Sequence, residues 1–90
     1  MSSLIRIFLE IKSGEFQGFE RVIKRLNNED TDDFKKVIYF EISHLQGLKR
    51  KYKGHPLLVN DLEDQIINLI IAERLINESQ KRKIKQTRRN

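Results

Sequence analysis

The segment with the most distinctive chemistry is Glu41-Ile42-Ser43-His44. A glutamate and a histidine three residues apart on a helix lie on neighbouring turns, and di-iron helical bundles hold metal with such pairs plus further glutamates. Glu73, in the last apolar segment, would add a ligand, and a homodimer would double the set. Counted from a turn at Gly54, however, Glu41 and Glu73 are offset by about six residues, roughly 9 Å along a helical hairpin. A metal-dependent helical-bundle oxidase therefore ranks third among our hypotheses, and we expect no metal and no cofactor.

Other residues suited to catalysis are scarce. The chain has no cysteine, two histidines and four glycines, and these glycines do not form a phosphate-binding loop. The positions of Ser13, Ser43 and Ser79 do not favour a Ser-His-acid triad. We therefore predict that the protein is not an enzyme. The absence of cysteine fits a reducing compartment, and we expect a cytoplasmic protein.

Basic residues are the clearest candidates for binding. Residues 81–90 carry six of the 18 basic residues and no acidic one, a charge of +6, while residues 1–80 carry 12 basic and 13 acidic residues, a charge of −1. A run of this kind is often only a solvated terminus, but it can also bind phosphates by releasing counterions, without reading base sequence. We assign nucleic-acid binding to ten residues of this tail and of a second basic cluster, namely Lys81, Arg82, Lys83, Lys85, Arg88, Arg89, Lys49, Arg50, Lys51 and Lys53.

The elements that position these residues are predicted to be helices. Residues 4–11 could be a strand or a helix, and a helix is favoured because a lone strand would have nothing to pair with. Gly14 ends or kinks this helix, and apolar residues three and four apart over 16–26 predict a short amphipathic helix. The third helix is expected to start at Thr31 as N-cap and to end at Gly54 as a left-handed C-cap. Tyr39 and Phe40 fall off its main apolar stripe, and we expect them to pack against the first two helices. The alternative is that they form an exposed recognition patch.

The last helix is expected to open at Pro56 and to run to about Ser79, with the basic tail beyond. At 100° per residue, two apolar stripes lie on different faces of this helix. The first stripe should face the core and comprises Leu58, Leu62, Ile66, Leu69, Ile70 and Ile76. The second comprises Ile67, Ile71 and Leu75.

The second stripe predicts an interface. Leaving three such side chains exposed forgoes several kcal/mol, at about 1.5–3 kcal/mol for each one buried, and favours association. A two-fold contact needs only this one patch on each subunit, so we expect a homodimer. The main alternative is that the helix at 4–11 covers this stripe within the monomer.

Together these features predict an all-α protein: a small bundle of three to four helices completed by homodimerisation, with a helical domain at 1–80 and a flexible basic tail at 81–90. The leading hypothesis is a non-enzymatic binding module, a regulator or adaptor that acts through apolar helix faces while its tail contacts nucleic acid or an acidic partner. The alternative is a nucleic-acid-binding protein proper that uses the tail and the 49–53 cluster. No stretch reaches the roughly 18 apolar residues of a membrane span, so we expect no membrane contact.

Overall fold

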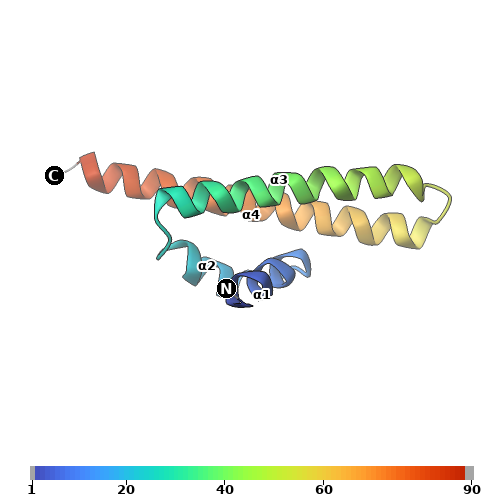
Figure 1. The fold of residues 1–90 in the computed structure, drawn as a ribbon, viewed down its shortest axis with the longest axis horizontal. Coiled ribbons are helices and arrows are strands. Elements are labelled where there is room, and N and C mark those ends of the chain that lie inside the picture. Colours follow the sequence, from blue (N-terminus) through green and yellow to red (C-terminus); the bar gives the residue numbers. More distant parts are fainter. Residues whose placement is uncertain (1, 89–90) are drawn as a thin grey trace.

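Two long helices form the frame of the molecule, and two short ones cover one side of it (Figure 1). The structure is a computed structural model that describes the backbone of residues 2–88 and the side chains of residues 4–82. Within these residues there are four helices and no strand, which confirms the all-α prediction. The helices are α1 (Ser2–Lys12), α2 (Gln17–Ile23), α3 (Asn28–Lys51) and α4 (Pro56–Arg88).

The first two helices follow the apolar spacing of their sequences. Helix α1 buries Ile7 and Ile11, so residues 4–11 form a helix rather than a strand. Gly14 ends it with a φ of 88°, a left-handed conformation that costs glycine little, and its amide bonds the carbonyl of Ile11. Helix α2 is shorter than the apolar pattern over 16–26 and ends at Ile23.

Both predicted ends of α3 need correction. The N-cap is Asn27, not Thr31, because the Asn27 Oδ1 accepts the Asp30 amide at 2.7 Å. The Thr31 side chain is buried inside the first turns, where its hydroxyl donates to the Asn27 carbonyl at 2.7 Å. At the other end, Gly54 does not adopt a positive φ, since Gly14 is the one residue with that conformation in the part of the chain that is described. The loop closes instead through a bond from the His55 amide to the Tyr52 carbonyl.

Helices α3 and α4 pair antiparallel in a register fixed by polar contacts. The Lys35 Nζ lies 3.0 Å from the Asn77 Oδ1, and the Gln80 Nε2 lies 3.0 Å from the Asp32 Oδ1. Near the loop, the Lys49 Nζ lies 3.1 Å from the Glu63 Oε1. The pairing therefore continues over most of α3.

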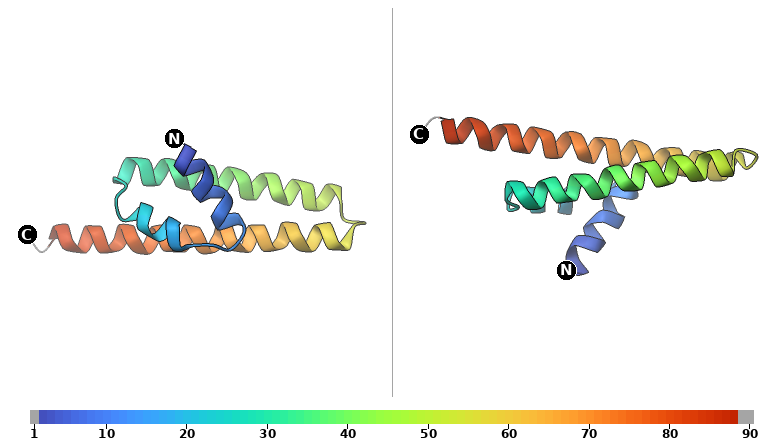
Figure 2. Two further views of the ribbon diagram at one scale, coloured as in Figure 1. Left: turned by 90° about the horizontal axis from the view of Figure 1, so that it is seen from below. Right: turned by 45° about the horizontal axis from the view of Figure 1, so that its top comes forward.

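Helices α1 and α2 lie together on one face of this hairpin, as the two views in Figure 2 show. The core lies between the two layers and draws on all four helices. Its largest fully buried apolar side chains are Phe19, Ile11, Ile38, Leu69 and Ile76. The opposite face of the hairpin carries no helix within residues 2–88, which leaves α3 and α4 uncovered there.

The molecule is elongated, with extents of 55 × 23 × 18 Å. Helix α4 contributes to this length because it continues to Arg88 rather than ending near Ser79. The boundary at residue 80 and the flexibility of residues 81–90 stay predictions. Among residues 2–88, no helix has both the length and the apolar character needed to cross a bilayer.

Candidate functional site

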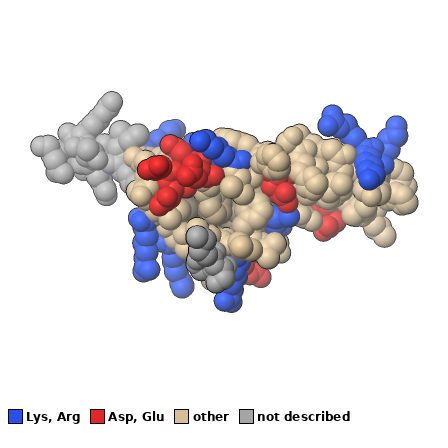
Figure 3. Space-filling view, in the orientation of Figure 1, with Lys and Arg blue, Asp and Glu red and all other residues tan. Residues whose placement is uncertain are grey.

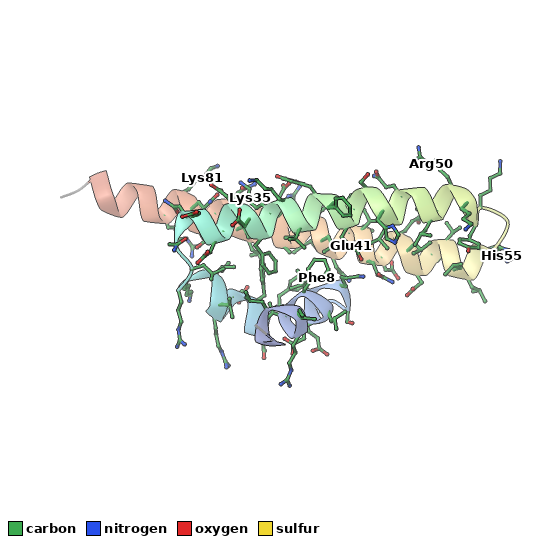
Figure 4. All side chains as sticks on the ribbon, viewed as in Figure 1. Phe8, Lys35, Glu41, Arg50, His55 and Lys81 are labelled. Carbon is green, nitrogen blue, oxygen red and sulfur yellow. The ribbon has the colours of Figure 1, made fainter. Side chains whose placement is uncertain are left out.

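The three residues considered for metal binding have separate surroundings. Glu41 forms a partly buried ion pair with Lys12 of α1, and Figure 4 shows Glu41 on the side of α3 that faces α1. His44 is exposed, and Glu73 interacts with Tyr39. Nowhere in the described part of the chain do three histidine or acidic side chains come together as a metal site would need.

The offset predicted between Glu41 and Glu73 is also too large. Because Lys35 lies opposite Asn77 and Lys49 opposite Glu63, the residue opposite Glu73 is Tyr39. Glu41 is therefore offset from Glu73 by about two residues, roughly 3 Å along the axis rather than 9 Å. The two carboxylates are separated by direction instead, since one points to α1 and the other contacts Tyr39.

Tyr39 and Glu73 form a polar contact on the uncovered face of the hairpin. The Glu73 carboxylate raises the pKa of the Tyr39 hydroxyl above 10.0, first through a side-chain hydrogen bond and further through desolvation and charge repulsion. Tyr39 and Phe40 are both exposed, Phe40 to 79%, so the expectation that they pack against the first two helices is wrong.

The 49–53 cluster lies at the loop end of the molecule, where Figure 3 shows a group of basic side chains. Lys49, Arg50 and Lys51 fill the last turn of α3, where the negative end of the helix dipole stabilises them. Lys49, Arg50 and Lys53 line a surface hollow of about 620 Å³ together with Gln46 and Val59. Lys49 is also paired with Glu63, so part of its charge is neutralised within the chain.

The basic end of α4 lies far from this cluster. Lys81 and Arg82 are exposed, whereas the side chains of Lys83, Lys85, Arg88 and Arg89 fall outside the described residues. Glu63, which lies beside Lys49, is 18 residues from Lys81 along α4, a separation of about 27 Å. The two groups assigned to nucleic-acid binding therefore do not form one compact surface. Lys35, Lys81 and Arg50 nevertheless all point away from α1 and α2 (Figure 4).

The two apolar stripes of α4 separate largely as expected. Leu62, Ile66, Leu69 and Ile76 are buried, whereas Leu58 and Ile70 of the same predicted stripe are 40% and 43% exposed. In the second stripe, Ile67 and Ile71 are 54% and 37% exposed.

The first helix does not cover the second stripe. Helix α1 reaches α4 at Asn68, whose Nδ2 donates to the Lys12 carbonyl at 3.0 Å. Leu75 is partly buried against the core, beside Ile23 of α2. Ile67 and Ile71 thus remain open to solvent, on the far side of α4 from Leu62 and Leu69.

A second apolar surface lies between α1 and α3. A groove of about 480 Å³ is lined by apolar side chains and by two acidic residues, and comprises Leu4, Ile5, Phe8, Leu26, Asp30, Asp33, Phe34 and Val37. Periodicity alone does not reveal this groove, because Leu4, Phe8 and Val37 also fit the apolar spacing expected of core-facing side chains in their helices. One signal was present: Ile5, which lines the groove, is an apolar residue of α1 outside the stripe that buries Ile7 and Ile11.

The chain was compared with protein-family models, with curated proteins and with solved structures. None of the three comparisons finds a match.

Proposed function

We propose that this chain is a non-enzymatic helical binding module, a regulator or adaptor, whose first partner is a second copy of itself. The observation that carries the proposal is the exposure of Ile67, Ile70 and Ile71 on one stretch of α4. Isoleucine side chains are among those most often buried, and a contiguous exposed group of them favours association.

The position of these side chains supports an interface that needs no rearrangement. Helix α4 is contacted by α3 on one side and by α1 and α2 on another, so the side chains of its core stripe are already buried within the subunit. Ile67 and Ile71 lie on the far side of α4 from the buried Leu62 and Leu69, and no helix within residues 2–88 covers them there. A second copy could dock on this face while both subunits keep their own cores.

The proposal is tested by the double change Ile67→Lys with Ile71→Glu. Removing two isoleucines from each side of a two-fold contact should raise the dissociation constant at least tenfold and give a folded monomer with unchanged helicity. The change Leu9→Lys is the control, because Leu9 is 57% exposed and lies on α1, outside the proposed contact. Loss of helicity at constant molecular mass would contradict the proposal.

A second candidate function is phosphate-directed binding of nucleic acid, favoured by the hollow lined by Lys49, Arg50 and Lys53 and by the basic end of α4. Both features supply cations without an arrangement that reads bases. Their separation of about 27 Å equals roughly eight base pairs of duplex at 3.4 Å per pair, so a short duplex would contact one group at a time.

This candidate makes a prediction about length and salt. Deleting residues 81–90 should weaken binding to any base sequence about equally and flatten the salt dependence. Changing Lys49, Arg50 and Lys53 to Gln should weaken binding to a 20-base-pair duplex more than binding to an 8-base-pair duplex, because the short duplex contacts one basic group at a time. Fluorescence anisotropy between 50 and 200 mM salt measures the affinity for each duplex and its salt dependence. An affinity that does not change with salt concentration would contradict this function.

A further inference from the structure

A charged pair flanks the exposed isoleucines of α4. Asp64, Ile67, Ile71 and Arg74 follow one another at spacings of three, four and three residues, the repeat that keeps side chains on one seam of a helix. All four are exposed. Neither Asp64 nor Arg74 has an ion-pair partner among the side chains described, residues 4–82. The seam is thus apolar in the middle, acidic at one end and basic at the other.

This order of residues is complementary to itself when reversed. Ile67 and Ile71 are placed symmetrically about Leu69, and so are Asp64 and Arg74. If two copies of α4 cross antiparallel at the level of Leu69, one two-fold axis sets Ile67 beside Ile71 of the second copy. The same axis sets Asp64 beside Arg74 of the second copy, and it does so twice.

A parallel arrangement has the opposite electrostatics. In-register parallel helices would set Asp64 beside Asp64 and Arg74 beside Arg74, and like charges across an interface disfavour a pairing. The free charges of the seam therefore select the direction in which two copies can associate.

From this we infer that the second copy docks antiparallel along α4, with Ile67 and Ile71 at the centre of the interface and Asp64–Arg74 ion pairs between copies at both ends. The inference rests on the proposed self-association and adds its geometry. In this arrangement α1, α2 and the groove between α1 and α3 stay outside the contact.

Charge reversal tests the pairing. Asp64→Arg turns both ion pairs into repulsions and should raise the dimer dissociation constant about tenfold. Adding Arg74→Asp restores both pairs in the reverse sense, so the double variant should return to within about threefold of wild type. Asp61→Arg is the matched control, because it makes the same charge change one turn away, off the seam, and should leave the constant unchanged. Sedimentation equilibrium at 50 mM salt measures all four proteins.

A distance measurement tests the direction independently. The chain has no cysteine, so Asn60→Cys carries a single spin label on an exposed position of α4. In the antiparallel dimer the two labels are 18 residues apart along the axis, about 27 Å, whereas parallel helices would bring them to about 10 Å.

The outcomes separate the two proposals. A wild-type protein that is monomeric at high micromolar concentration overturns the self-association itself. A dimer in which the double charge reversal stays as weak as Asp64→Arg, or in which the labels lie near 10 Å, overturns the antiparallel pairing and leaves the dimer standing. A dimer unaffected by any of these changes places the interface on another surface, such as the groove between α1 and α3.

Discussion

At the scale of single residues, Lys12 joins the two layers of the molecule. Its ammonium pairs with Glu41 of α3 and lies 5.7 Å from the centroid of the Phe8 ring. Its backbone carbonyl accepts a hydrogen bond from the Asn68 side chain of α4. Both charged side chains are 20% exposed, so solvent screens the pair less than it screens a surface ion pair. The pairing gives Glu41 a structural partner within the chain.

The ion pair predicts a coupling between two substitutions. Lys12→Met and Glu41→Gln should each lower the free energy of unfolding by about 1–2 kcal/mol, because each leaves the other charge partly buried and unpaired. The double variant should cost less than the two single changes together. Urea unfolding followed by circular dichroism measures the cycle. Lys36→Met, which affects an exposed contact of 3.9 Å with Asp33, is the control and should change stability by less than about 0.5 kcal/mol. Strictly additive costs would contradict the pairing.

Tyr39 predicts a pH dependence. Since Glu73 raises the pKa of Tyr39, the neutral phenol is stabilised, and this contribution is present below pH 10 and lost as the pH rises through the raised value. Glu73→Gln should return the pKa of Tyr39 toward 10. Phenolate absorbance, recorded in a Tyr52→Phe background so that one tyrosine remains, measures the shift. An unchanged titration after Glu73→Gln would show that the carboxylate is not the cause.

At the scale of elements, two glycines should respond to alanine in opposite directions. Gly47 lies inside α3 with no atom within 4 Å of an added Cβ, so Gly47→Ala should stabilise the protein by about 0.5–1 kcal/mol. Gly14 has a φ of 88°, so Gly14→Ala should destabilise it by about 1–2 kcal/mol. Thermal unfolding compares the two, and a stabilising Gly14→Ala would show that the α1–α2 turn can change conformation without cost.

The sequence identified the helices well and their ends less well. Apolar spacing is enough to predict α3 and α4, because burial of one face dominates helix formation in proteins. Residues 4–11 also fit strand alternation, and α1 was predicted because a lone strand would have no partner. The N-cap of α3 depends on which side chain bonds the first free amides of the helix. The Asn27 side chain accepts the Asp30 amide, so α3 starts before Thr31. The register of α3 against α4 also differs from the one obtained by counting outward from Gly54, because side chains lean toward the N-terminus of their own helix. In an antiparallel pair this lean moves contacts on the second helix away from the turn, which brings Glu73 opposite Tyr39.

At the scale of the whole molecule, the surfaces were harder to predict than the core. Buried residues such as Leu62, Leu69 and Ile76 follow from periodicity, but exposure depends on which face each neighbouring helix covers. The layer of α1 and α2 leaves Phe40 in solvent and builds the groove beside α3, and neither follows from the pattern of one helix. The length of the hairpin also separates two basic groups that composition alone suggested could act together.

The measurement that tests the central claim most directly is the molecular mass of the wild-type protein in solution. Multi-angle light scattering at high micromolar concentration should give twice the 10.8 kDa of the chain, because a second copy would bury the exposed isoleucines of α4. A mass of 10.8 kDa at that concentration would contradict the account.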